Sequence, residues 1–299
     1  KYTMPRITSF SQQSLARVID SVSPLTPAFP LDYTPSPGDG FGQSAAISGN
    51  RAIVGADGVE DGDNQNSGAA YIFDVTTGSL LHTLNNPNAF DIATGDRFGT
   101  SVAISGDRCI VGAPDEDDAD RSGAGKAYIF NVNNGQLVHT LDNPGPASIN
   151  FANFGFSVSI SGDRAIVGAP GADAQPYLGG DWVGAGRVFI YDVVSGNLVH
   201  TIEDPNVFGT RVDDEFGYSV AISGNRAIVG APFEDETDLS NSGKAYIFDV
   251  ATGNLVHTLD NPNAFGTADG DWFGWVVAIS GDRAAVHPTL ESDENGIYS

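Results

Sequence analysis

The chain has 299 residues, 40% of them hydrophobic, and contains 37 Gly and 16 Pro. Its 38 acidic and 14 basic residues give a net charge of −24, which repels nucleic acid and anionic membranes and attracts cations. No apolar run approaches the roughly 20 residues of a membrane span. We therefore expect a soluble protein with no nucleic-acid partner and no membrane span in this chain.

Residues 1–40 precede a repeated unit. Within them, residues 15–22 (LARVIDSV) are apolar enough to form a β-strand. We interpret residues 1–40 as a lead-in segment that also supplies one strand to the repeats.

The repeated unit begins with a Phe-Gly pair. It starts at Phe41, Phe98, Phe154, Phe216 and Phe273, at spacings of 56 to 62 residues. This period is longer than that of leucine-rich or helical repeats and suits four short strands with their turns, so each copy is predicted to be one blade of a β-propeller. The expected blades are 41–97, 98–153, 154–215, 216–272 and 273–299, and together they form one domain.

The second copy shows the expected strands. Residues 98–105 (FGTSVAIS) alternate small and apolar side chains, and Gly106-Asp107 suits a two-residue hairpin turn. Three further strands are expected at 108–113, 126–132 and 137–141. Gly112 lies where neighbouring backbones must approach closely, and Cys109 is expected to be a small buried residue. The fold class is all-β, with four antiparallel strands in each blade.

Because successive strands of a blade run in opposite directions, the connections between them alternate between two opposite faces of the molecule. The turns after the first and third strands of each blade are short, whereas the loops after the second and fourth strands are long, acidic and variable. Because ligands usually bind to loops held on a rigid scaffold, we expect the working surface on the long-loop face.

The chain ends indicate how the ring closes. The fifth copy stops at residues 296–298 (GIY), which match the beginning of a third strand, so the copy lacks a fourth. A strand from residues 15–22 would complete the blade and remove an exposed sheet edge. We therefore predict five blades, with the ring closed by the N-terminal strand.

The signature of each copy is Phe-Gly-x-Ser-Val-Ala-Ile-Ser-Gly-Asp-Arg-Ala-Ile-Val-Gly-Ala-Pro, followed by an acidic loop and Ser-Gly-x-Ala-Tyr-Ile-Phe. It resembles the FG-GAP repeat family over residues 41–299. The resemblance implies a propeller like that in the head of integrin α subunits, with extracellular ligand binding and adhesion, often with calcium. The integrin calcium loop lies in the first hairpin of a blade. That hairpin is too short here, as in residues 48–51 (SGNR), so the integrin calcium ligands have no counterparts.

Acidic residues recur at matching positions of the long loops. Three follow the second strand in the first, second and fourth copies, and another Asp stands two residues before Phe-Gly in four copies. These candidate calcium ligands are Glu60, Asp61, Asp63, Asp117, Asp118, Asp120, Asp235, Glu236 and Asp238, with Asp39, Asp96, Asp214 and Asp271. The third copy lacks both features, which indicates that the two loops act together. Calcium takes about six to eight oxygen ligands. The alternative is that these acids are solvated or cap turns.

The third copy has the longest loop after its second strand. It carries Tyr177, Asp181 and Trp182, which we predict to bind a ligand, because exposed aromatic rings stack on sugars and anchor protein partners. The alternative is that these rings fold back onto the blade.

Two basic residue types also recur once in each of several copies. The histidines His82, His139, His200 and His257 share one strand position, and the arginines Arg51, Arg108, Arg164, Arg226 and Arg283 follow the first turn. Equivalent positions on different blades cannot converge on one metal ion, so we expect the histidines to serve blade packing and the arginines to pair locally.

The sequence contains no recognisable catalytic arrangement, and we predict that the protein is not an enzyme. The leading hypothesis is an extracellular or cell-surface interaction module that binds a protein or glycan through the acidic long-loop face, with possible calcium support. One alternative is a structural subunit that assembles with copies of itself. A less favoured alternative is a propeller hydrolase or lyase acting on polysaccharides.

Overall fold

The structure is a computed structural model that describes residues 34–60, 62, 65–87, 94–145, 151–172, 184–205, 214–235, 241–262 and 270–288. These residues form eighteen strands and no helix. The strands are β1 (Ala45–Ser48), β2 (Arg51–Ala56), β3 (Ala69–Asp74), β4 (Leu80–Asn85), β5 (Ser101–Ser105), β6 (Arg108–Ala113), β7 (Lys126–Asn131), β8 (Leu137–Asp142), β9 (Ser157–Ser161), β10 (Arg164–Ala169), β11 (Arg187–Asp192), β12 (Leu198–Glu203), β13 (Ser219–Ser223), β14 (Arg226–Ala231), β15 (Lys244–Asp249), β16 (Leu255–Asp260), β17 (Val276–Ser280) and β18 (Arg283–His287).

Each of the first four repeats folds into one antiparallel sheet in which consecutive strands are neighbours, and the fifth contributes the pair β17 and β18. In the second sheet, β5 pairs with β6 up to Ser105↔Arg108. Gly106 has a φ of +59° at the first position of the connecting turn, as a two-residue hairpin requires. The described residues thus confirm an all-β fold of propeller-like repeats, with four complete sheets and a partial fifth.

The Phe-Gly pair joins consecutive sheets and precedes the strand ladder. Phe98 is fully buried, and its backbone N–H donates to Ser67 O of the preceding repeat at 3.1 Å. A Cβ added to Gly55 of β2 would lie 2.0 Å from Gly99 O. The same approach recurs at three further junctions, between Gly112 and Gly155, Gly168 and Gly217, and Gly230 and Gly274. A side chain at these strand glycines would push the sheets apart, which explains the glycine at this position in the first four copies.

In the first four repeats, the serine two residues after the Phe-Gly glycine crosses the same junction. Ser101 Oγ donates to Gly155 O of the next repeat at 2.7 Å. The bond recurs from Ser44 to Gly99, from Ser157 to Gly217 and from Ser219 to Gly274. At the opposite end of the strand, Ser105 Oγ accepts from the backbone N–H of Gly162 at 3.1 Å. Both ends of the first strand are therefore tied to the next repeat.

Apolar side chains fill the space between consecutive sheets. Val111 of β6 packs in one cluster with Ile53 of the first sheet, whereas its neighbour Ile110 packs in another cluster with Val167 of the third. Successive residues of a strand point to opposite faces, so each inner strand serves two junctions.

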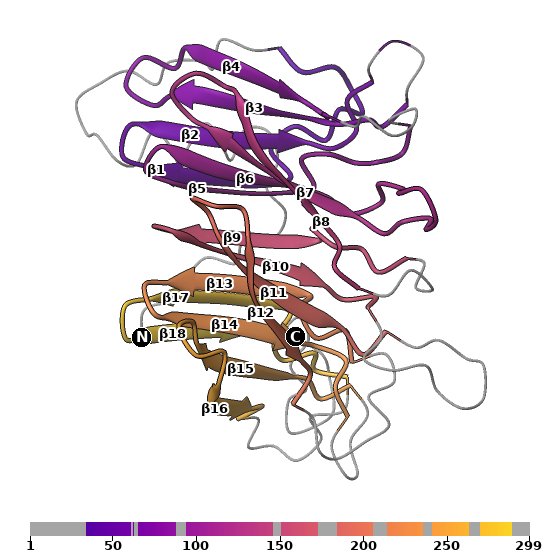
Figure 1. The fold of residues 1–299 in the computed structure, drawn as a ribbon, viewed down its shortest axis with the longest axis vertical. Coiled ribbons are helices and arrows are strands. Elements are labelled where there is room, and N and C mark those ends of the chain that lie inside the picture. Colours follow the sequence, from indigo (N-terminus) through magenta and orange to yellow (C-terminus); the bar gives the residue numbers. More distant parts are fainter. Residues whose placement is uncertain are drawn as a thin grey trace, which may run out of the picture.

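The first strands of all five repeats face a common cavity. Residues of β1, β5, β9, β13 and β17 line a volume of about 660 Å³. Figure 1 shows the sheets following one another in chain order, with β17 and β18 alongside β13 and β14. The first strands of the five repeats line one cavity, a propeller-like arrangement.

The predicted closing strand at 15–22 and the matching end at 296–298 lie outside the described residues, so ring closure and the domain boundaries stay predictions. None of the described residues belongs to a helix long and apolar enough to cross a membrane.

Candidate functional site

The strand directions place every long loop at one end of the cavity. The loops between β2 and β3 and between β4 and β5 lie at that end, and their equivalents recur in the next repeats. We call this end the long-loop face and the opposite end, with its tight turns, the short-turn face. Of the thirteen carboxylates predicted to bind calcium, the nine that the structure describes belong to the long-loop face.

Two of these carboxylates cap their own loops. Asp117 Oδ1 accepts from the backbone N–H of Gly123 at 2.7 Å. In the fourth repeat, Asp235 Oδ1 accepts from the backbone N–H of Asn241 at the same distance. The repeated geometry matches the turn-capping alternative for these two positions.

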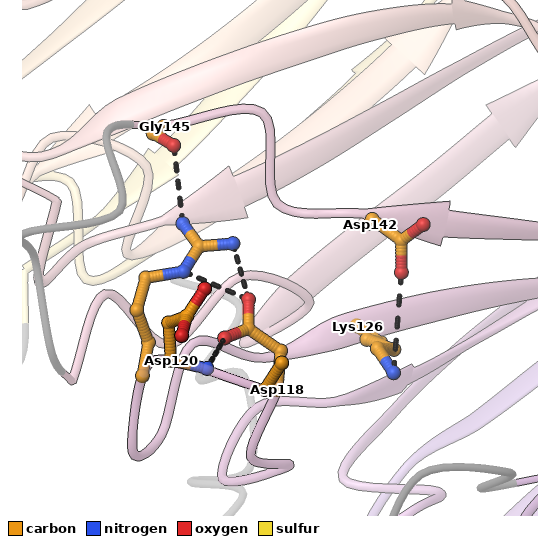
Figure 2. A pocket seen from close by; sticks show the side chains of 7 residues that line it. Asp118, Asp120, Lys126, Asp142 and Gly145 are labelled. Carbon is orange, nitrogen blue, oxygen red and sulfur yellow. Dashed lines mark hydrogen bonds and ion pairs between the residues drawn. The ribbon is translucent and has the colours of Figure 1, made fainter.

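Asp118 lies in an ion pair at the edge of a pocket of about 320 Å³ (Figure 2). Its carboxylate accepts from Arg121 Nε at 2.8 Å, and Arg121 also donates to Gly145 O at 3.1 Å. Although partial burial raises the pKa of Asp118, the bonds from Arg121 and from the Asp120 N–H hold it below its usual value. The arginine thus supplies positive charge where the sequence predicted a cation.

The aspartates before Phe-Gly lie between repeats. Asp96, Asp214 and Asp271 are buried. Asp96 accepts from Asn86 Nδ2 at 2.7 Å and Asp271 from Asn261 Nδ2 at 3.0 Å, and each asparagine follows the last strand of the preceding sheet. These carboxylates connect successive repeats. Asp39, by contrast, is half-buried and accepts from the backbone N–H of Ser36 at 2.7 Å.

The other predicted site residues fall into two groups. Glu60 and Asp120 are exposed. Asp61, Asp63, Glu236, Asp238, Tyr177, Asp181 and Trp182 lie outside the described residues. Among the residues that are described, no three His, Cys, Asp or Glu side chains converge in a way that could hold a metal ion.

A buried group that the sequence did not point to lies beneath the long loops. Glu116 is fully buried, accepts from Tyr128 Oη at 2.7 Å and lies 3.0 Å from Lys126 Nζ. Burial raises the pKa of Glu116 to about 7, opposed by Tyr128 and Lys126 and reinforced by Asp96. Glu234, Tyr246 and Lys244 repeat the arrangement in the fourth repeat, and burial likewise raises the pKa of Glu234 to about 7. The available signal was that two of the chain's few lysines stand at equivalent positions, two residues before a tyrosine.

A second feature missed from the sequence is an aromatic cluster at the cavity. The residue directly after each Phe-Gly pair lines the cavity at the long-loop face; these residues are Gln43, Thr100, Phe156, Tyr218 and Trp275. The last three form a row, with ring centroids 5.0 Å apart for Phe156 and Tyr218 and 4.4 Å apart for Tyr218 and Trp275. All three rings are partly exposed. We call this row the aromatic mouth.

Two more rings extend the aromatic mouth. Phe233, from the loop after β14, lies edge-on to Trp275 at 6.0 Å, and Trp272 stacks on Trp275 at 5.4 Å with an interplanar angle of 22°. Trp275 of the fifth repeat therefore packs against rings of the fourth.

The recurring basic residues have structural roles. His139 Nε2 lies 3.1 Å from Val194 O in a turn of the next repeat, and His82 and His200 make the same contact. Arg51 pairs with Asp74 of its own sheet at 2.6 Å, as Arg226 does with Asp249. The expectations of blade packing for these histidines and of local pairing for these arginines are confirmed.

Comparison with known proteins gives a family match. A model described as FG-GAP repeat matches residues 35–73, 88–130, 150–191 and 209–248, more than half of the chain. No curated protein matches. The chain is similar to a solved structure titled "Crystal structure of the computationally designed Ika4 protein", with 15% identity, a TM-score of 0.43, and coverage of 74% of this chain and 95% of that one. The matched segments include four of the five residues that follow Phe-Gly at the cavity.

Proposed function

The chain belongs to the FG-GAP repeat family, and we propose that it is a non-catalytic extracellular interaction module that binds a protein or glycan through its long-loop face. The observation that carries the proposal is the aromatic mouth. Partly exposed aromatic rings at the end of a cavity provide contact area at low entropic cost, which is typical of binding sites.

The proposal includes a ring of five blades closed by a strand from residues 15–22. It is supported by the first strands of all five repeats, which line one cavity, and by the fifth sheet, to which the described residues contribute only β17 and β18. Deletion of residues 1–33 is then expected to lower the thermal midpoint and to promote association through the unpaired edge of the fifth sheet. A deletion variant that melts and sediments like the full chain would contradict closure.

The absence of catalysis is part of the same proposal. Several described carboxylates of the long-loop face bond to other groups of the protein: Asp117 caps a loop, Asp118 pairs with Arg121, and Asp96 accepts from Asn86. The buried Glu116 bonds to Tyr128 and Lys126 beneath the surface. This use of the carboxylates favours binding over hydrolysis, and turnover of any polysaccharide by the purified chain would contradict it.

Calcium support stays a prediction from the sequence. The described acids do not form a ligand set, and Asp61, Asp63 and Asp238 are not among the described residues. Ligand contact by Tyr177, Asp181 and Trp182 is likewise a prediction.

The experiment that tests the function compares the two faces. Binding to immobilised matrix proteins and polysaccharides is measured for wild type and for two charge-reversal pairs. The first pair, Glu60→Arg with Asp120→Arg, changes exposed acids of the long-loop face; the second, Asp163→Arg with Asp282→Arg, makes the same charge change on the short-turn face. We expect the first pair to change the affinity by about fivefold or more and the second to leave it unchanged. Equal effects of the two pairs would contradict the assignment.

A second function, self-assembly, is favoured by one observation. The outer strands expose Leu137, Leu198 and Leu255, at 43%, 41% and 45% of their surface. Repeated apolar side chains on the rim could pack against another copy. Sedimentation at micromolar concentration tests this function: association that is lost in Leu198→Ser supports it, and a monomer contradicts it.

A further inference from the structure

Five equivalent positions make one side of the cavity mouth aromatic and the other polar. Three successive repeats contribute Phe156, Tyr218 and Trp275, whereas the first two contribute Gln43 and Thr100. The cavity they line has a volume of about 660 Å³, which falls within the usual range for sites that enclose small ligands. A ligand for this mouth must therefore have one apolar face and one polar face.

The aromatic side is held in place by its neighbours. Tyr218 lies between Phe156 and Trp275, and Phe233 meets Tyr218 edge-on with centroids 6.1 Å apart. Burial raises the pKa of Tyr218 to about 12, with Glu215 adding to the effect, so its hydroxyl remains a donor at neutral pH. The rings thus form a fixed surface with a hydroxyl donor in the row.

The polar side forms one hydrogen-bonded network. Thr100 Oγ1 donates to Arg97 O at 2.8 Å and lies 3.4 Å from Asp57 Oδ2, and Arg97 Nη2 pairs with the same Asp57 oxygen at 2.7 Å. The amide of Gln43 faces Asp57 as well. Arg97 also lies 3.6 Å from Asp115, so its single positive charge is shared by two carboxylates, and the network offers hydroxyl and amide groups beside a net negative charge.

Both sides together fit the chemistry of a pyranose sugar. The C–H face of a pyranose packs on an aromatic ring, and its hydroxyls exchange hydrogen bonds with hydroxyl and amide groups. A net charge of −24 repels acidic sugars, and the paired Arg97 is not available to attract them. The mouth therefore favours an uncharged sugar.

We propose that the cavity mouth binds a neutral pyranose oligosaccharide, with one ring stacked on Tyr218 and Trp275 and its hydroxyls bonded to Gln43 and Thr100. This inference rests on the proposed function, since it names the ligand of the same face. The residues of this site differ from the ligand-binding residues predicted from the sequence, Tyr177, Asp181 and Trp182.

Intrinsic fluorescence gives a direct test, because two of the chain's three tryptophans, Trp272 and Trp275, belong to the aromatic mouth. Neutral gluco-, manno-, xylo- and chito-oligosaccharides are titrated to about 10 mM, a concentration that detects a Kd of about 1 mM. We expect at least one of them to shift the emission saturably, and oligogalacturonate not to do so. No shift with any neutral sugar would overturn the inference.

Variants separate the two sides of the mouth. Trp275→Ala is expected to weaken binding by about tenfold, and the isosteric Thr100→Val by about fivefold. Phe151→Ala is the matched control, because Phe151 is 65% exposed on the same face and does not line the cavity. Calorimetry is used for the variants, with circular dichroism to verify folding. Wild-type affinity in folded Thr100→Val and Trp275→Ala would overturn the inference.

Different experimental results would contradict the glycan inference and the proposed function. If the long-loop charge pair abolishes binding to a protein while no sugar binds, the glycan inference is wrong and the interaction module stands. If a sugar binds and its affinity is reduced by Thr100→Val, the inference is supported even when the matrix proteins show no binding.

Discussion

At the residue scale, buried acidic side chains form hydrogen bonds and ion pairs inside the repeats. Glu116 and Glu234 are fully buried, and each accepts from a tyrosine and lies beside a lysine. Burial and the neighbouring Glu116 raise the pKa of Tyr128, so its hydroxyl stays protonated and donates to the carboxylate. Removing one partner would leave a buried polar group unsatisfied, which makes these clusters costly to disturb.

The raised pKa of Glu116 predicts a pH-dependent stability. Folding raises it from 4.5 to about 7, so the native state binds a proton more tightly than the unfolded state. The resulting stabilisation is complete below pH 4.5 and is lost as pH rises through 7; the pKa difference corresponds to roughly 3 kcal/mol. We expect Glu116→Gln to remove only its own part of the decline in unfolding free energy between pH 5 and 8, because Glu234, whose pKa is also raised to about 7, still contributes.

Urea unfolding at several pH values measures that decline. Asp74, Asp192 and Asp249 have lowered pKa values, from their backbone and side-chain hydrogen bonds, so their effects fall at more acidic pH and do not enter this window. Asp163→Asn is a control, since this Asp is exposed. A wild-type slope in Glu116→Gln would show that Glu116 does not titrate as described.

At the scale of the elements, the Phe-Gly motif acts as a joint between sheets. Phe98 fills the junction with its ring, 5.7 Å from that of Tyr128, while its backbone bonds to the preceding repeat. The residue before Phe is in the left-handed region at Arg97, Asn153, Glu215 and Trp272, with φ between 52° and 57°. This conformation costs a non-glycine residue about 1 kcal/mol, so the joint maintains it against local preference.

Two glycines of the second repeat test the joint. A Cβ at Gly112 would lie 1.9 Å from Gly155 O, whereas one at Gly106 would meet nothing within 4 Å although φ is +59°. We expect Gly112→Ala to lower the unfolding free energy by about 3 kcal/mol and Gly106→Ala by about 1 kcal/mol. Urea denaturation of both variants provides the comparison. Similar losses would show that the close approach does not limit stability.

Much of the fold followed from the sequence because hairpin geometry depends on adjacent residues. Gly106-Asp107 indicated the turn between β5 and β6, and Gly112 indicated a close backbone approach, both as observed. The contacts of the loop acids could not be predicted from adjacent residues in the same way. Asp117 reaches a backbone N–H six residues away, a contact that depends on how the loop folds.

The buried Glu–Tyr–Lys clusters and the aromatic mouth could not be predicted from the sequence for a different reason. Glu116 meets Tyr128 only when two strands pair, and Tyr218 meets Trp275 only when two sheets pack together. In the sequence, the residue after Phe-Gly varies from Gln43 to Trp275, so it does not look like part of a site. Its importance comes from the cavity that brings the five positions together.

At the scale of the whole molecule, five repeats place unlike faces at the two ends of one cavity. The short-turn face is regular, with Arg51, Arg164 and Arg226 each paired to an Asp of its own sheet. The long-loop face breaks the symmetry, because the aromatic side chains after Phe-Gly belong to the third, fourth and fifth repeats. A binding surface can therefore be directional although the scaffold repeats.

Calcium binding by the long loops would affect the stability of the whole molecule. If the long loops bind calcium, millimolar calcium added after chelation is expected to raise the thermal midpoint, and magnesium is not. Asp117→Ala or Asp96→Ala should reduce the rise, whereas Asp163→Ala on the short-turn face should not. Equal effects of calcium and magnesium would indicate screening of the acidic surface and would contradict a specific site.

Hydrogen exchange of the backbone amides, measured with and without a ligand found in the binding panel, tests whether the long-loop face binds. We expect slower exchange at the long-loop face, around Thr100, Tyr218 and Trp275, and unchanged exchange in the turns at Gly106 and Gly162. Protection confined to those turns would contradict the assignment of binding to the long-loop face.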